Sequence, residues 1–342
     1  MGKTIDELLE LPSGEAVRRR ALALLDDAAA AGARIADPAD VEAVHDFRVG
    51  LRRLRSLMKL HRDELGGKLN RLRKKLGEVA ALTGDARDAE VQLAWLFSRK
   101  RSVPRGARPA LDWLSGRLEE RKQAGYARAR TLAGARFARL AIELRRRLRR
   151  YHVALDEERG GATLAETTAR LAREQSAELA GILATVSAPT DEEPAHRARI
   201  AGKQARYLVE PLVESQRAGA EAAAAVKALK KLQDLLGELH DVHVFAGQLD
   251  AMAAGSEPRV QKGLLAIADL VRARRDELHA DLLRGREAPP PLEAVAMRLS
   301  PADDTRMLQG GHTTGDDPEE GSWRDPSNDD PRTPPVRRLV AR

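Results

Sequence analysis

The sequence predicts an all-α protein built from two related halves. Its 342 residues are rich in Ala, Leu and Arg, only 3% are aromatic, and Gly and Pro concentrate near the ends and between stretches of helical periodicity. We find no run of residues with the pattern expected of a β-strand. Two short motifs in the first half recur in the second half, which indicates an internal duplication.

Apolar residues recur at helical spacing through the first half, and Gly or Pro marks the ends of the helices. The first helix stops before Asp37-Pro38, and the second stops at Gly66-Gly67. The third is long with a bend at Gly84, Pro104 opens the fourth, and an arginine-rich helix precedes Gly160-Gly161. The expected ranges are about 12–36, 38–64, 68–101, 104–132 and 136–151.

The second half repeats this succession of helices separated by breaks. Each half is expected to form a four-helix, up-and-down bundle. Beyond the prolines at 289–291 the composition changes to Asp, Pro, Gly, Thr and Arg with little apolar periodicity. We therefore expect a folded domain over residues 1–287, with repeats at about 13–150 and 163–287, and a disordered tail over residues 288–342. The expected second-half helices span about 163–186, 192–217, 220–254 and 257–285.

Composition restricts the possible functions. The chain has no Cys, which excludes disulfides, thiolate metal ligands and a cysteine nucleophile. No segment has the apolar length of a membrane span, and the first residues lack the pattern of a secretory leader. We expect a cytoplasmic protein with no membrane partner. The net charge is +7, and because residues 288–342 hold ten acids and seven arginines, residues 1–287 carry +10.

Two motifs define the duplication. The segment HDFRVGLRRLRS, which begins at His45, has a counterpart HRARIAGKQARY, which begins 151 residues later at His196. Downstream, LTGDARDAEV at 82–91 corresponds to LLGELHDVHV at 235–244, so that Asp88 matches Asp241 after a two-residue insertion. The order and spacing of both motifs recur, although few residues are identical. The positions that persist in the first motif are mainly a histidine and three cations.

These cations fall on one face of each helix. Successive residues of an α-helix turn by about 100°, so offsets of three, seven and ten residues place the histidine and the cations in one narrow sector. The first stripe is His45, Arg48, Arg52 and Arg55, with Lys59 one turn further on, and the second is His196, Arg199, Lys203 and Arg206. Like charges at this spacing repel each other, and a solvated face would normally interleave acids. The stripes therefore indicate an anionic ligand.

The chemistry and spacing of the stripes favour a phosphate polymer. The guanidinium of Arg donates two parallel hydrogen bonds to phosphate oxygens and keeps its charge, and Lys adds a mobile point charge. The cations repeat about every 5 Å along each helix, which suits an extended polyanion better than a single phosphate. A lone histidine more often satisfies a buried contact, but the duplicated placement of His45 and His196 favours a role in anion binding.

The two motif pairs resemble those of the CHAD family, the conserved histidine α-helical domain, over roughly residues 10–287. The resemblance implies two four-helix bundles related by pseudo-twofold symmetry, with basic residues of equivalent helices lining a central groove. It also implies inorganic polyphosphate as the ligand, no catalytic reaction and no cofactor. The residues expected to bind polyphosphate are both stripes and, from the helices that follow them, Lys74 or Lys75 and Lys227, Lys230 and Lys231.

Some positions are given a structural interpretation. Asp88 and Asp241 are expected to hold nearby arginines in place or to cap a helix, because a carboxylate facing polyphosphate would repel it. Gly50 and Gly202 weaken their helices by somewhat under 1 kcal/mol each relative to Ala, and close helix packing would explain their presence. Ser56 stands where the second half has Tyr207, and Gln204 and Gly202 lie among the second-half cations, so the strength with which each half binds stays open at this stage.

Three alternative functions stay open at this stage. The dipeptides His45-Asp46 and His240-Asp241 could belong to a metal-dependent phosphohydrolase, but the arginines around His45 would repel a divalent metal. Non-specific nucleic-acid binding is compatible with a pI near 9.8, although few aromatic residues are available for base stacking. The third is a scaffold that self-associates or recruits a protein partner to polyphosphate granules, a role compatible with polyphosphate binding.

Overall fold

A computed structural model describes residues 4–37, 39–40, 42–150, 161–285 and 290–300, and over these residues the chain is helical with no β-strand. No helix in these ranges combines the length and apolar character that crossing a membrane requires. The elements are α1 (Ile5–Leu9), α2 (Ser13–Arg34), α3 (Ala43–Leu60), α4 (Arg62–Leu65), α5 (Gly67–Ala81), α6 (Gly84–Arg99), the 3₁₀ turn η1 (Arg105–Ala107), α7 (Arg108–Arg128), the π turn η2 (Ala129–Ala133), α8 (Gly134–Arg149), α9 (Leu164–Ala184), α10 (Glu192–Val209), the 3₁₀ turn η3 (Glu210–Glu214), α11 (Gly219–Ala254), α12 (Pro258–Gly285) and α13 (Leu292–Leu299).

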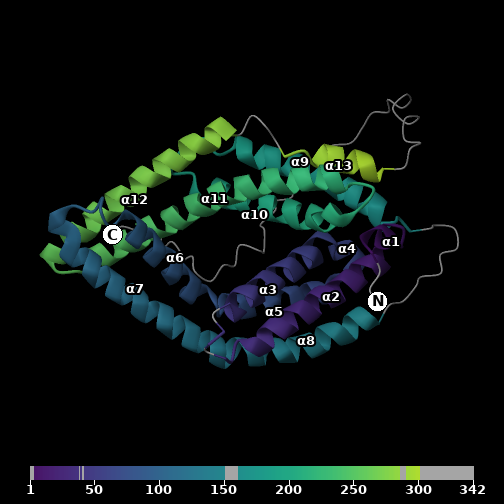
Figure 1. Cartoon of the computed structure of the whole chain (residues 1–342), viewed down its shortest axis with the longest axis horizontal. Helices are drawn as coiled ribbons and strands as arrows, with labels where there is room; N and C mark the ends of the chain where they lie inside the picture. The colour runs from purple at the N-terminus through teal and green to yellow at the C-terminus, as the bar shows by residue number, and fades with distance from the viewer. Residues whose placement is uncertain (1–3, 38, 41, 151–160, 286–289, 301–342) are drawn as a thin grey trace, which may run out of the picture.

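Two four-helix bundles form the body of the molecule, as the sequence predicts. In the first, α2, α3, α5 and α8 contact one another in that order around a closed ring. In the second, α9, α10, α11 and α13 make the equivalent contacts, so its fourth helix is α13 and not the expected helix at about 257–285, which is α12. Figure 1 shows the second bundle above the first, and the described helices that meet across the junction include α3 with α10 and α2 with α9.

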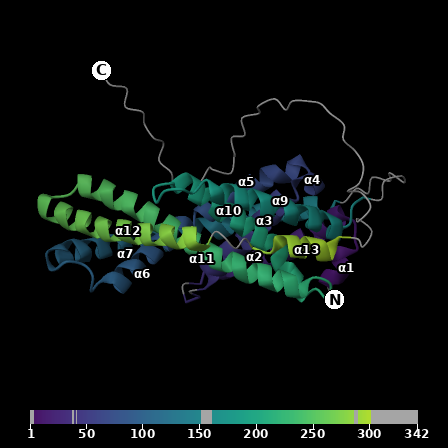
Figure 2. The same cartoon turned by 90° about the horizontal axis from the view of Figure 1, so that it is seen from above.

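A narrower arm extends from the body, seen on the left of Figure 2. It consists of the α6–α7 and α11–α12 hairpins, which pack on each other through α7 and α12. Small residues allow this approach: a Cβ added to Gly263 would lie 2.4 Å from the Cβ of Ala110, and one added to Gly125 would lie 2.6 Å from the backbone nitrogen of Ala86. The arm therefore depends on glycine where its helices touch.

The two halves differ in where their helices are interrupted. The predicted bend at Gly84 is a break between α5 and α6, whereas the corresponding α11 is one helix of 36 residues. In the first half, α7 continues through the π turn η2 directly into α8. Residues 286–289, between α12 and α13 in the second half, lie outside the described residues. The duplication thus preserves the helix contacts without preserving every helix boundary.

Close packing explains one of the two stripe glycines. A Cβ on Gly50 would lie 3.1 Å from the Cα of Ala28 in α2, so α2 and α3 approach closely at this point. In the same bundle, Phe47 of α3 and Phe137 of α8 meet edge to face across the core at 5.1 Å. Gly202 has its nearest such atom at 3.9 Å, in Gln233, so close helix packing does not account for it.

The expectation that every residue after 287 is disordered is wrong for α13. Leu292, Val295, Ala296 and Leu299 are fully buried, at helical spacing, against α9 and α11. The Arg298 Nε also donates to Glu221 at 2.6 Å. The composition around α13 is rich in Pro and acidic residues and hides its short apolar stripe. In the second bundle α13 takes the place that α8 takes in the first. The rest of the predicted tail, from residue 301, lies outside the described residues.

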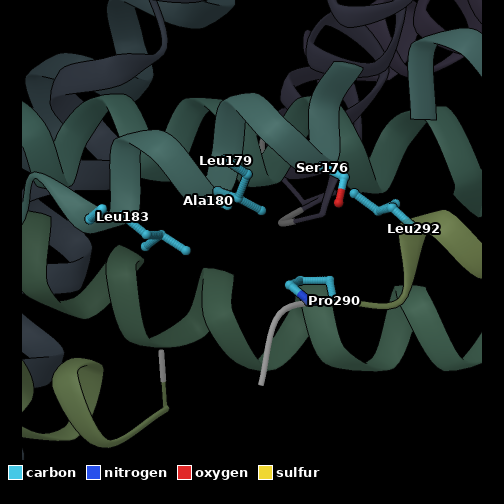
Figure 3. A pocket seen from close by; sticks show the side chains of 7 residues that line it. Ser176, Leu179, Ala180, Leu183, Pro290 and Leu292 are labelled. Carbon is cyan, nitrogen blue, oxygen red and sulfur yellow. The ribbon is translucent and has the colours of Figure 1, made fainter. Parts of the chain in front are cut away.

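A cavity of about 370 Å³ lies between α9 and the segment that leads into α13 (Figure 3). It is mainly apolar and shares no residue with either cationic stripe. Its lining consists of Ser176, Leu179, Ala180, Leu183, Ala184, Pro290 and Leu292.

The packing of α13 predicts that it stabilises the whole domain. Leu299→Ala removes a fully buried side chain and is expected to lower the free energy of unfolding by about 2–5 kcal/mol in urea denaturation. Met297→Ala is the matched control, because Met297 lies on the same helix but is 71% exposed, and it should change stability by less than about 0.5 kcal/mol. Equal effects of the two changes would contradict the docked position of α13.

Candidate functional site: a shared cationic surface

The contact between α3 and α10 brings residues of both stripes together. Lys203 on α10 lies close enough to Arg48 and Arg52 of α3, and to Arg199 of its own helix, for each arginine to disfavour its charge. These four residues are called the cationic cluster below, and all four are half-buried. The two stripes, distant in sequence, therefore form parts of one surface at the junction of the bundles.

The charged form of Lys203 is disfavoured in this cluster. Burial, followed by the charges of Arg199, Arg52 and Arg48, lowers the pKa of Lys203 well below the ordinary lysine value of 10.5, and Asp241 offsets this only in part. An anion placed beside the ammonium group would favour the charged form and raise the pKa again. The cluster thus concentrates positive charge at the junction of the bundles.

The break between α5 and α6 positions Arg48. Its Nη1 donates a hydrogen bond of 2.7 Å to the Oγ1 of Thr83, which in turn donates to the carbonyl of Ala80 at 2.7 Å. Thr83 is fully buried, so this support is rigid. Thr83 lies inside the duplicated motif LTGDARDAEV, but sequence reasoning did not identify it as a residue that orients an arginine.

Arg55 and Arg206, at matched positions of the two stripes, are held by different neighbours. Arg55 lies against Gly77 of α5, where an added Cβ would be only 2.9 Å from its Nη2. The guanidinium of Arg206 lies 4.8 Å from the centre of the Tyr207 ring and 4.0 Å from the carboxylate of Glu210. Packing therefore restricts both side chains before any ligand binds.

Asp88 and Asp241, predicted to be structural, lie near each other beside the cluster. The pKa of Asp241 is raised, mainly by burial and further by the charge of Asp88, while Arg199, Lys203 and Arg87 act in the opposite direction. The two matched motifs thus place their carboxylates next to the cations. They supply a partial counter-charge at this side of the surface.

The histidines of the two stripes occupy different environments. His45 is exposed, whereas the Nδ1 of His196 lies 3.3 Å from the Nδ1 of His240. In this contact one Nδ1 donates its proton and the other Nδ1 accepts it. His243 instead contacts the carbonyl of Pro189 at 2.6 Å. The contact between His196 and His240 was not predicted, although each belongs to a motif that the sequence singled out.

The five lysines of the following helices are all exposed, and helix geometry separates them. Lys74 lies three residues before Gly77, which Arg55 contacts, and so shares its side of α5, while Lys75 lies on the opposite side. In α11, Lys230 lies three residues before Gln233, whose Nε2 donates to the carbonyl of Gly202 on α10 at 2.8 Å. Lys231 lies on the side of α11 opposite Gln233. Lys227 lies about 120° around the helix from Gln233.

The arrangement provides cations rather than a metal-binding constellation. Within the described ranges, no group of three or more His, Asp or Glu side chains could hold a metal ion. Lys59, the last residue of the first stripe, is half-buried and extends the surface by one helical turn beyond Arg55. The surface is suited to bind a phosphate-rich anion through guanidinium forks and one desolvated ammonium group.

The fold and this surface define a class of all-α proteins in which two duplicated bundles share one cationic junction. The chain belongs to the CHAD family: the CHAD domain family model matches residues 19–250, which confirms the family that the duplicated motifs predict.

Two solved structures share the fold. The crystal structure of the CHAD domain from the plant Ricinus communis is 22% identical, with a TM-score of 0.59, and the match covers 85% of this chain and 92% of that chain. PptA from Streptomyces chartreusis is 17% identical, with a TM-score of 0.61 and coverage of 81% and 98%. At these identities the likeness shows the fold. No curated protein matches the chain.

The crowding of cations predicts that the site costs stability when no anion is bound. Lys203→Gln removes a charge that Arg199, Arg52 and Arg48 repel, and it is expected to raise the free energy of unfolding by about 1 kcal/mol in low-salt buffer without phosphate. The gain should be complete below the folded-state pKa of Lys203 and should vanish as the pH rises to 10.5, where the unfolded lysine also loses its proton. Urea denaturation at several pH values measures this, and a stability loss at all of them would contradict the interpretation.

Proposed function

We propose that this protein binds inorganic polyphosphate on the surface formed by the two stripes at the junction of α3 and α10. The observation that carries the proposal is the cationic cluster, in which Lys203 is desolvated and faces three arginines from two helices. Membership in the CHAD family supports polyphosphate as the anion. The function is one of binding, with no catalytic step.

A polymer fits this surface better than a small anion does. The first stripe runs from His45 to Lys59, about 21 Å of helix, and the second runs from His196 to Arg206, about 15 Å. Inorganic phosphate could contact only a few of these side chains at once. A long chain can engage the cluster together with Arg55 and Arg206, and each contact made lowers the cost of the next.

Binding to a phosphate polymer also suits a cytoplasmic protein that collects at polyphosphate granules. The basic surface provides the attachment, and the role follows from the proposed ligand. A fluorescently tagged protein should form foci in cells that store polyphosphate and should be diffuse in cells that cannot make it. Foci of equal number in both kinds of cell would count against granule targeting. They would not test polyphosphate binding, which the titration below measures.

The direct test is a titration of the purified protein with long-chain polyphosphate at about physiological salt, alongside single-stranded RNA of matched charge. Arg48→Glu/Arg52→Glu and Lys203→Glu/Arg206→Glu each reverse two charges of one stripe. We expect each double variant to weaken polyphosphate binding at least about 100-fold, because charge-assisted contacts are replaced by repulsion. The parent protein should prefer polyphosphate over RNA.

The control is Arg105→Glu/Arg259→Glu, which makes the same change in net charge at the far end of the arm, where both side chains are exposed. It should bind polyphosphate within about threefold of the parent at this ionic strength, because distant charges are screened. If the control loses as much affinity as the stripe variants, or if RNA competes equally, the protein is a general polyanion binder and the proposal is wrong.

The lowered pKa of Lys203 predicts that binding takes up a proton. A bound anion restores the charge on Lys203, so affinity should fall as the pH rises from the pKa of the free protein's Lys203 toward 10.5. Arginine side chains in general do not titrate over this range, whereas lysine does. Lys203→Arg should bind with a flatter pH dependence, measured by titrations at constant ionic strength. An unchanged slope in Lys203→Arg would show that another group takes up the proton.

A further inference from the structure

A second group of cations lies on the outer face of α8. Arg136, Arg139, Arg146 and Arg149 are exposed, and none makes an ion pair or hydrogen bond with a described residue. They are called the outer arginine track below. Ile142, between them, is 73% exposed, so no described part of the chain covers this face. The track extends over about 20 Å of helix.

An arginine-rich composition alone does not explain the track. In α12, by contrast, Arg272, Arg274, Arg275 and Arg284 each contact a carboxylate. Even within α8, the arginines at the sides of the helix are paired, as Arg145 with Asp26 and Arg147 with Glu143. The outward sector of α8 combines several cations at helical spacing with no acid, which leaves their mutual repulsion uncompensated.

The track faces away from the cationic cluster. In the first bundle, α8 contacts α2 and α5, which in turn contact α3, so α3 and α8 occupy diagonal corners. Phe47 and Phe137 meet between them in the core. Figure 1 accordingly shows α8 along the lower edge of the molecule, with α3 on the side toward the second bundle. A ligand on the track is therefore separated by the bundle from a ligand on the cluster.

The track is not required by the duplicated fold. In the second bundle α13 takes the place of α8, and its outward residues include Glu293, Met297 and Arg298, of which Arg298 is paired with Glu221. The second bundle thus packs its equivalent corner without a row of cations. The four arginines are a property of one half, which points to a role other than stability.

We propose that the outer arginine track is a second binding surface for a phosphate polymer, so that one protein molecule bridges two polyphosphate chains. The identity of the polymer rests on the proposed function; the existence of the second surface rests on the track. Arginine forks along one convex helix suit an extended chain of phosphates. A lipid surface is a poorer fit, because membrane-surface helices bury a broad apolar face, and here that face, with Phe137 and Leu144, is already in the core.

A two-chain capture assay tests this directly. Polyphosphate is immobilised at low density, the full-length protein is bound and unbound protein is washed away, and a second, fluorescently labelled polyphosphate chain is added. The parent protein should recruit the labelled chain. Arg139→Glu/Arg146→Glu/Arg149→Glu should still be captured through the cluster but should recruit at least about tenfold less labelled chain, because three charge-assisted contacts are lost. Exposed helix positions accept Glu readily, so the fold is retained.

The matched control is Arg101→Glu/Arg105→Glu/Arg108→Glu, which makes the same change in charge at exposed positions around the α6–α7 turn and should recruit the labelled chain as the parent does. Recruitment by the track variant equal to that of the parent, an equal loss in the control, or equal recruitment of labelled RNA or anionic lipid vesicles would each overturn the proposal. Failure of the parent to be captured in the first step would instead refute the proposed function, so the two failures are distinguishable.

Discussion

Repulsion between like charges at the contact of α3 and α10 is the constraint to which the rest of the molecule is fitted. Half-buried cations repel each other more strongly than solvated ones, because the local dielectric constant is lower and salt screens them less. The bundles must therefore hold this contact together by other means. Fully buried apolar residues on α3 and α10, such as Leu51, Leu54 and Val209, anchor each helix in its own bundle, so that the cations can be presented at the surface between them.

Duplication gives this surface its form. A single bundle would present one stripe along one helix, whereas two bundles related by a pseudo-twofold axis place Arg48 and Arg52 beside Lys203 and Arg199. The carboxylates of Asp88 and Asp241 are brought near each other by the same symmetry. The symmetry is incomplete where a specific neighbour is needed: only the first half breaks its helix at Thr83 to hold Arg48, and only the second supports Arg206 with Tyr207.

Patterns local to one helix were predictable from the sequence, and contacts between helices were not. The spacing of His45, Arg48, Arg52 and Arg55 placed them on one face, and the Gly and Pro breaks gave most helix boundaries. No sequence rule gives the distance between two stripes 151 residues apart, so the crowding around Lys203 and the pairing of His196 with His240 needed the structure. α13 was missed for a different reason: its four apolar residues are too few to outweigh the composition around them until α9 and α11 are seen to lack a neighbour there.

Placing the cations on packed helices rather than on loops also affects how this surface would select the proposed polymer. Flexible arginines lose side-chain entropy when they bind, which offsets part of the electrostatic gain. Here Arg48 is already held by Thr83, and Arg55 by Gly77, so less entropy would be lost on binding the proposed ligand. A preorganised surface of fixed spacing favours a polymer whose charges are dense enough to meet each cation in turn. A more sparsely charged polymer would leave some half-buried cations without a partner, and their uncompensated repulsion would lower its affinity.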